Sequence, residues 1–141
     1  MTKQVSVFSE NKPGKLASIS KILKDNGINI RAIKISSSGD FGVVKLLVNK
    51  PELCYQKLRE AGITAYLRDI IGIVLRDEPG GLFEISSILA KYSINIEDSY
   101  GFVIEDKKRA VLIIETSDSE HLKNILNKEK IDYFTGDTLY N

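Results

Sequence analysis

Hydrophobic and polar residues alternate along residues 4–9, which is the pattern of a strand with one buried face. The period then changes, because Leu16, Ile19 and Leu23 recur at the three- and four-residue spacing of one helix face. Pro13 suits the first turn of that helix, where its missing N–H group is not needed. The chain is therefore expected to open with a strand and an amphipathic helix.

A helix end and a hairpin are expected next. Residues 25–27 read Asp-Asn-Gly, a sequence typical of a helix C-terminus. Residues 29–36 alternate again, and the Ser-Ser-Gly-Asp turn at 37–40 leads into the apolar run 41–48. This spacing predicts two antiparallel strands joined by a hairpin turn. The Gly-Asp-Phe-Gly sequence at this turn is explained by the residue preferences of hairpin turns and not by a catalytic loop.

A second helix and a last strand complete this half of the chain. The helix is expected to begin at Pro51 and to end at Gly62, with Cys54, Leu58 and Ala61 on one face. A β-like segment follows it directly. The order of elements predicted for this half is βαββαβ.

The sequence then repeats itself at an offset of about 66 residues. Residues 12–23 (KPGKLASISKIL) recur as residues 78–89 (EPGGLFEISSIL), and residues 28–30 (Ile-Asn-Ile) recur as residues 94–96 at the same spacing. A chance similarity between two helices would not also give the same residues at the start of the following strand. Two copies of one unit therefore fill the chain.

The second copy is expected to have the same order of elements. Its predicted segments are a strand at 73–76, a helix at 80–92, strands at 95–104 and 109–116 joined by a turn at Lys107 and Lys108, a helix at 118–128 and a strand at 132–134. Ser117 and Glu120 stand at the spacing of a capping box at the start of the last helix.

A βαββαβ unit forms an antiparallel four-stranded sheet with both helices on one face, the ferredoxin-like arrangement of the α+β class. Residues 68–74 contain no flexible linker, so we expect two modules, residues 1–69 and 70–141, to be packed side by side. The sheet faces and edges that remain bare would be covered in a homodimer.

Composition narrows the function more than the fold. The 141 residues include 43% hydrophobic and 28% charged residues, as in ordinary globular proteins and unlike disordered chains. Lys and Arg number 20 against 19 Asp and Glu, and no basic block stands out, so nucleic acid is not an expected partner. No apolar run approaches the roughly 20 residues that span a bilayer, and no signal-like segment opens the chain. We therefore expect a cytoplasmic location and no membrane partner.

Few residues of the chain support catalysis. Cys54 is the only cysteine and is expected to be a buried structural thiol, while His121 is the only histidine and is expected on the surface. They cannot form a disulfide, a CxxC motif or a metal site, and no Ser-His-Asp or phosphate-loop pattern occurs. RNA-recognition modules with this order of elements stack bases on aromatic side chains, which residues 109–114 lack. The sequence predicts a protein that is not an enzyme and that holds no metal or cofactor.

Two turn motifs carry a resemblance to a known family. Residues 10–16 (ENKPGKL), the following helix and residues 26–30 (NGINI) resemble an ACT domain, and residues 76–82 (RDEPGGL) with residues 93–96 (SINI) resemble it again. The resemblance covers nearly the whole chain and leaves no segment for a catalytic domain. It implies the ferredoxin-like fold. It also implies that the modules pair side by side into an eight-stranded sheet, as ACT modules commonly do.

The resemblance also implies a function. ACT domains bind amino acids at the interface between two modules, and they regulate enzymes of amino-acid metabolism or sense amino acids for transcription. A free amino acid is therefore the expected ligand of a regulatory or sensor protein. The alternative is a non-catalytic regulatory subunit, similar to the small subunits of acetolactate synthases, that docks on a separate metabolic enzyme.

The site implied by the resemblance lies at the two turns. In the serine-sensing ACT domains of phosphoglycerate dehydrogenases, an Asn of the turn and an Asn at the start of the next strand contact the effector. Asn11 and Asn29 match these positions and would orient an amino group. Gly14 and Gly80 lack a Cβ atom and would let a carboxylate approach N–H groups at a helix N-terminus.

The candidate ligand-binding residues are Asn11, Lys12, Pro13, Gly14, Lys15, Leu16, Asn29 and Ile30 in the first copy and Asp77, Pro79, Gly80, Gly81, Leu82, Asn95 and Ile96 in the second. Asp77 stands where the first copy has Asn11, so the two sites are expected to be related but not equivalent. The structural alternative is that Pro-Gly serves only as helix-start geometry and that Asn29 and Asn95 form local Asx turns.

Overall fold

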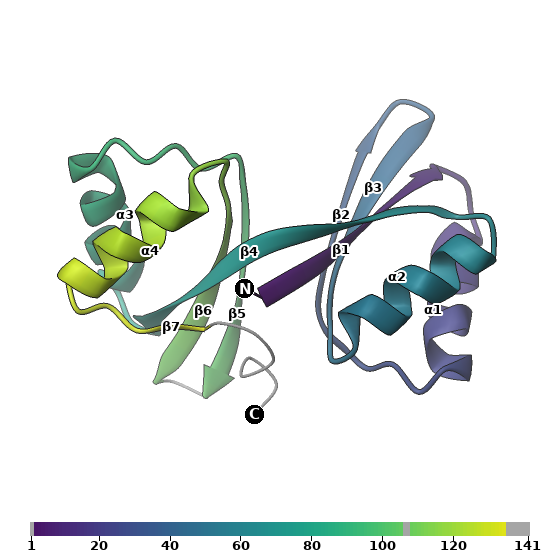
Figure 1. The fold of residues 1–141 in the computed structure, drawn as a ribbon, viewed down its shortest axis with the longest axis horizontal. Helices are drawn as coiled ribbons and strands as arrows, with labels where there is room; N and C mark the ends of the chain where they lie inside the picture. The colour runs from purple at the N-terminus through teal and green to yellow at the C-terminus, as the bar shows by residue number, and fades with distance from the viewer. Residues whose placement is uncertain (1, 106–107, 135–141) are drawn as a thin grey trace. The chain divides into compact units, whose positions relative to one another are not determined.

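The computed structural model describes residues 2–105 and 108–134. In the first half of the chain the elements are β1 (Thr2–Glu10), α1 (Lys15–Asp25), β2 (Ile30–Ser38), β3 (Phe41–Val48), α2 (Pro51–Glu60) and β4 (Thr64–Arg76). They are followed by α3 (Gly81–Lys91), β5 (Asp98–Glu105), β6 (Arg109–Glu115), α4 (Ser119–Lys128) and β7 (Tyr133–Phe134) (Figure 1). The predicted α+β class is confirmed.

The chain divides into two compact units within β4. The first module is Lys3–Arg68, and the second module consists of Thr2 and the described residues from Asp69 onward. β4 is one strand that ends the first module and begins the second, so the expected run of one strand into the next is confirmed. Each module is considered on its own below.

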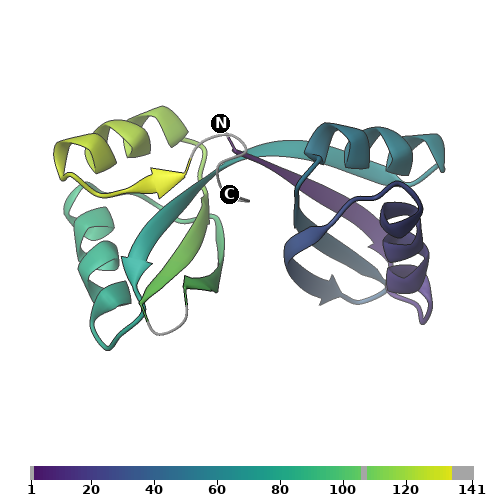
Figure 2. The ribbon, with the colours of Figure 1, turned by 90° about the horizontal axis from the view of Figure 1, so that it is seen from below.

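The sheet of the first module has the order β2-β3-β1-β4. β3 pairs antiparallel with both β1 and β2, and Val7 lies opposite Val44 in the first of these pairs. The helices α1 and α2 lie on one side of the sheet (Figure 2). Alternate residues of β1 and β3 are buried in one cluster with Ile19, Leu23 and Leu58 of the helices. The apolar periods of the sequence therefore meet in a single core.

The second module repeats this topology. Its strands have the order β7-β4-β6-β5, with β4 antiparallel to both of its neighbours and β5 antiparallel to β6. Ile71 and Ile73 of β4 pack with Ile85 of α3 and Leu122 of α4. Strand order and helix placement match the ferredoxin-like arrangement in both modules, as the sequence predicts.

Cys54 is fully buried in the core of the first module as a free thiol. Burial raises the pKa of this thiol to about 12, because a thiolate would lose its hydration there. The predicted structural role of Cys54 agrees with this position. His121 is exposed on α4, also as expected.

Three local predictions are wrong. Pro13 precedes α1 instead of lying in its first turn, because Gly14 is the N-cap residue with a left-handed φ of 90°. Ala61 is exposed beyond the end of α2, where its backbone caps the helix. The expected capping box is absent from these described residues, since Asp118 is the N-cap of α4 and makes no side-chain cap hydrogen bond.

The strand entry of the second copy also differs from the prediction. β5 begins at Asp98 and not at Asn95. The hydroxyl of Thr116 donates a hydrogen bond to the Asn95 carbonyl oxygen, and the Glu97 N–H group donates to the carbonyl oxygen of Glu115. These hydrogen bonds fix residues 95–97 beside the end of β6, before the regular pairing of β5 with β6 begins at Asp98. In the expected turn before β6, Lys107 lies outside the described residues.

Within residues 2–105 and 108–134, every helix is too short or too polar to cross a lipid bilayer.

Candidate ligand-binding site

The turn between β1 and α1 has a backbone shape that favours glycine. Gly14 is the N-cap of α1 with a φ of 90° and a ψ of −12°, a left-handed conformation that side chains with a Cβ rarely adopt. A Cβ atom built at Gly14 would meet nothing within 4 Å. Conformation, and not lack of space, therefore selects glycine at this turn, and the start of α1 remains open to a ligand.

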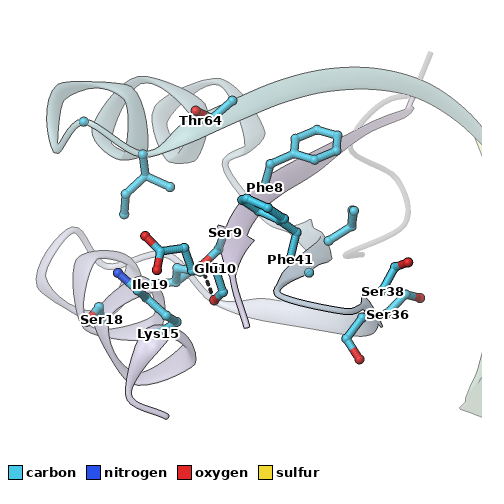
Figure 3. Close-up of a pocket in the computed structure, with 15 residues that line it drawn as sticks. Phe8, Ser9, Glu10, Lys15, Ser18, Ile19, Ser36, Ser38, Phe41 and Thr64 are labelled. Atoms are coloured by element: carbon cyan, nitrogen blue, oxygen red, sulfur yellow. Dashed lines mark hydrogen bonds between the residues drawn. The ribbon is translucent and has the colours of Figure 1, made fainter. Parts of the chain in front are cut away.

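A cleft of about 600 Å³ lies beside this turn in the first module, within the size range of small-molecule sites. It is formed where the end of β1, the first turns of α1, the β2–β3 hairpin and the α2–β4 turn meet (Figure 3). The lining residues are Phe8, Ser9, Glu10, Lys15, Ser18, Ile19, Ser36, Ser37, Ser38, Phe41, Gly42, Val43, Gly62, Ile63 and Thr64.

The charged groups of this cleft gather at the start of α1. Glu10 forms an ion pair of 2.6 Å with Lys12 of the turn, and Figure 3 shows the Lys15 ammonium near the Glu10 carboxylate. The hydrogen bond from Lys12, then the charges of Lys12 and Lys15, lower the pKa of Glu10. The first turn of α1 contains no acidic residue. A carboxylate and two ammonium groups therefore meet at a helix terminus that itself attracts anions.

The opposite part of the cleft is apolar and hydroxyl-rich. Phe41 is 68% exposed, and Phe8 makes an edge-to-face contact with Tyr66 at a ring-centroid distance of 5.5 Å. Three consecutive serines of β2, Ser36 to Ser38, complete this wall. Such a wall can hold an uncharged side chain.

A smaller cleft of about 280 Å³ occupies the same place in the second module. Its lining residues are Val74, Leu75, Arg76, Gly81, Glu84, Ile85, Arg109, Lys130, Ile131 and Asp132. The segment 74–76 corresponds to residues 8–10 of the first module at the repeat offset, and Gly81 corresponds to Lys15. Both repeats therefore form a cleft between the first strand, the first helix and the turn before the last strand.

Contacts inside the second module narrow its cleft. A Cβ atom at Gly81 would overlap the carbonyl oxygen of Arg76, so the helix start packs directly on the strand end. The Arg76 guanidinium group also forms ion pairs of 2.9 Å with Glu78 and with Glu84. Arg76 and Glu84 line this cleft at the positions that correspond to Glu10 and Ser18 in the first module.

The structure divides the predicted residues of the first copy into two groups. Lys15 lines the cleft, and Asn11, Lys12, Pro13 and Gly14 form the adjacent turn. Leu16, by contrast, is outside the lining and 43% exposed on the surface of α1.

Asn29 and Ile30 lie at the other end of the first module. The Asn11 N–H group donates to the carbonyl oxygen of Asp40, whereas the Asn29 N–H group donates to Oδ1 of Asn49. Asp40 and Asn49 flank the eight residues of β3, which separate them by roughly 25 Å at about 3.3 Å per residue. Asn11 and Asn29 of one module therefore cannot touch the same small ligand.

The second copy shows the same separation. Gly81 lines its cleft, and Asp77, Pro79, Gly80 and Leu82 belong to the turn and the start of α3. The Asp77 N–H group donates to the Lys108 carbonyl oxygen at 2.9 Å. Asn95 and Ile96 precede β5, and the Asn95 carbonyl oxygen accepts a hydrogen bond from Thr116, which follows the far end of β6.

Sequence reasoning missed the walls of the first cleft. Phe8, Phe41 and the serines of β2 were attributed to strand and hairpin patterns alone. Phe41 is an aromatic residue directly after the hairpin turn, and this position in the sequence is a signal that could have indicated the surface. Among residues 2–105 and 108–134, no group of three or more His, Cys, Asp or Glu side chains is placed to hold a metal ion.

Comparison with known proteins identifies the family. A model described as an ACT domain pair matches residues 1–141. Protein BT0572 from Bacteroides thetaiotaomicron superposes with a TM-score of 0.92 at 28% identity, over 99% of this chain and 96% of that chain. The regulatory subunit of aspartate kinase from Thermus thermophilus, in its ligand-free form, shares the fold with a TM-score of 0.66 at 19% identity, over 89% and 91% of the two chains. Comparison with curated protein sequences gives no significant match. The match over the full sequence shows that the chain belongs to the family of ACT domain pairs.

Proposed function

We propose that this ACT-domain regulatory protein is a non-catalytic sensor that binds a free amino acid reversibly. The observation that carries the proposal is the open cleft of the first module, where Glu10 and Lys15 stand beside the N-terminus of α1. An amino acid presents one carboxylate and one ammonium group a few bonds apart. The cleft offers a group of opposite charge for each.

The carboxylate of the ligand would lie at the start of α1. Leu16 and Ala17 occupy the first helical turn, where N–H groups have no intrahelical acceptor. Together with the Lys15 ammonium group, these N–H groups favour an anion. Glu10 would receive the α-ammonium group, because its lowered pKa keeps the carboxylate ionised well below neutral pH.

The side chain of the ligand is expected to be uncharged. Glu10 and Lys15 are the charged residues of the lining and are assigned to the backbone groups of the ligand, which leaves phenyl rings, hydroxyl groups and aliphatic side chains for the remainder. A ligand of about ten heavy atoms supports a dissociation constant in the micromolar to millimolar range. That range suits a sensor of metabolite levels.

The remaining predicted contacts need a second copy of an ACT module. Because Asn11 and Asn29 lie at opposite ends of the first module, one ligand can meet both Asn11 and Asn29 only if a partner chain supplies one of them. We therefore retain the homodimer as part of the proposal, and the cytoplasm as its location.

A thermal-shift experiment with the twenty common amino acids, each at about 10 mM, tests the proposal. Ligand at a hundred times its dissociation constant adds about 2.7 kcal/mol to the free energy of unfolding, which raises the melting temperature by several degrees. We expect such a rise with one or a few uncharged amino acids and none with lysine or glutamate. An unchanged melting temperature across the whole panel would contradict amino-acid sensing.

A second candidate is a regulatory subunit that docks on a separate enzyme of amino-acid biosynthesis, like the small subunits of acetolactate synthases. Ile33 and Ile35 of the edge strand β2 are 43% and 53% exposed, which leaves an apolar surface for contact. Isolation of the native protein separates the candidates. Co-purification with a catalytic chain, without any thermal shift by amino acids, would favour docking.

A further inference from the structure

We infer that the first module binds the amino acid and that the second module, with its smaller cleft, does not, so that each chain binds one ligand. The inference rests on the proposed function. It assigns different roles to two clefts that the repeat places in equivalent positions.

The equivalence of the clefts comes from matched lining residues. Six residues of the first cleft, at positions 8–10, 15, 18 and 19, correspond at the 66-residue offset to positions 74–76, 81, 84 and 85 of the second. Positions 62–64 correspond to 130–132, because Gly62 and Lys130 both have a positive φ before the last strand of their module. The repeat therefore places a cleft at the same position in both modules, with different residues lining it.

One substitution brings the helix start against the strand end. Lys15 of the first module has a side chain that needs space next to β1, and that space belongs to the cleft. Gly81 of the second module has none, and the Arg76 carbonyl oxygen occupies the position of the missing Cβ atom. The closer packing in the second module agrees with the smaller volume of its cleft, about 280 Å³ against about 600 Å³ in the first module.

A second difference is an ion-paired cluster of side chains at the second cleft. Ser18 of the first module is replaced by Glu84, whose carboxylate is 2.9 Å from the guanidinium group of Arg76. The same guanidinium group is 2.9 Å from Glu78. Ser18 instead turns its hydroxyl group to the Gly14 carbonyl oxygen at 3.0 Å and leaves the cleft clear.

The charge at the two helix starts also differs. Residues 10–18 contain one carboxylate and two ammonium groups, whereas residues 76–84 contain three carboxylates and one guanidinium group. The lining of the second cleft also contains Arg109, Lys130 and Asp132, so the contrast is confined to the helix start, where a ligand carboxylate meets more carboxylates in the second module than in the first. The smaller volume of the second cleft and the carboxylates at its helix start therefore both disfavour binding of the amino acid in the second module.

Isothermal titration of the full chain tests the inference. The probes are L-alanine, L-valine, L-threonine and L-phenylalanine, and the titration is repeated with whichever amino acid raises the melting temperature most in the panel. We expect one ligand per chain. Two ligands per chain would contradict the inference but would agree with amino-acid sensing. If no amino acid binds, both the proposed function and this inference are contradicted.

A matched pair of variants assigns the single site to a module. Lys15→Met removes the ammonium group but keeps the length of the side chain, and we expect it to weaken binding by tenfold or more. Arg76→Met removes the guanidinium group of the second module, and we expect the affinity to stay within twofold and the stoichiometry to stay at one. Ligand-free melting temperatures of both variants report their folding. A loss of affinity in Arg76→Met as large as that in Lys15→Met would overturn the assignment.

Discussion

The carbonyl oxygen of Arg76 fills the position where a Cβ atom of residue 81 would lie, and Gly81 is the residue found there. Lys15 stands at the equivalent position of the first module, where the helix start is further from the strand and a cleft remains. The two modules thus share a topology but differ in how closely α1 and α3 approach the sheet.

Gly81→Ala tests this close approach. Alanine has the higher helix propensity, so an uncrowded helix start would become more stable. Because the added methyl group meets backbone atoms, we expect the variant to lose about 1–3 kcal/mol of unfolding free energy. Urea denaturation measures the change, and Lys15→Ala is the matched control that should lose little. Equal stability of Gly81→Ala and the wild type would contradict the packing described for the second module.

Gly14 and Gly80 provide a second matched pair. Their φ angles of 90° and 93° are left-handed, a conformation that costs about 1–2 kcal/mol when a Cβ atom is present. We expect Gly14→Ala and Gly80→Ala to lose this amount of unfolding free energy to a similar extent. In calorimetric titration only Gly14→Ala should weaken the ligand, since its turn borders the open cleft. Equal effects on affinity would assign the ligand to both turns.

Much of the fold follows from local patterns that the sequence displays. The spacing of Ile19 and Leu23 predicts the buried face of α1, and both side chains are buried as expected. Leu16 shares their spacing but lies in the first turn of α1 and is exposed. Periodicity therefore predicts the face of a helix better than the depth of each residue on it.

The cleft could not be predicted in the same way. Glu10, Lys15 and Ile63 line one cleft because of the sheet order and the α2–β4 turn. The spacing of these residues in the sequence does not indicate that they lie close together. The family motif identified the turn that contains Gly14 correctly as a helix start. The same motif predicts Asn11 and Asn29 in one site, because a sequence motif contains no information on the distance between its residues in the fold. In the structure the length of β3 separates the two residues within a module.

The contact between Tyr92 and Glu129 predicts a pH-dependent stability. The Tyr92 hydroxyl group donates to Glu129 at 2.6 Å, and this bond is the main cause of the lowered pKa of that carboxyl group. A carboxyl group whose pKa is lowered by folding stabilises the protein above its unfolded pKa, near 4.5, and loses that effect as the pH falls through the folded pKa. We expect Tyr92→Phe to melt at a lower temperature than the wild type at pH 7, and the difference to shrink towards pH 3.

Tyr133→Phe is the control for this dependence. The Tyr133 hydroxyl group donates to Oδ1 of Asn127 at 3.0 Å, and an amide acceptor does not titrate. Its deletion should lower the melting temperature by an amount that is the same at pH 7 and pH 3. Parallel curves for both variants would show that the ionisation of Glu129 does not contribute through Tyr92.

The distance between Asn11 and Asn29 leads to a prediction about the homodimer. An amino acid is far shorter than the roughly 25 Å that β3 places between the two ends of the first module. If one ligand contacts both side chains, they come from different chains. Asn11→Ala and Asn29→Ala should then each weaken binding at every site of their own homodimers.

Mixing the two variants should restore part of the binding. In a heterodimer of Asn11→Ala with Asn29→Ala, one site combines both substitutions and the other combines two intact asparagines. Subunit exchange at equal concentrations gives heterodimers in about half of the dimers, so about a quarter of the sites should regain the wild-type affinity. Titration before and after exchange measures the recovery, and a mixture of differently tagged wild-type chains controls for exchange itself. If exchange is complete and no tight sites appear, Asn29 does not act across the dimer, and the ligand depends on the cleft of one chain alone.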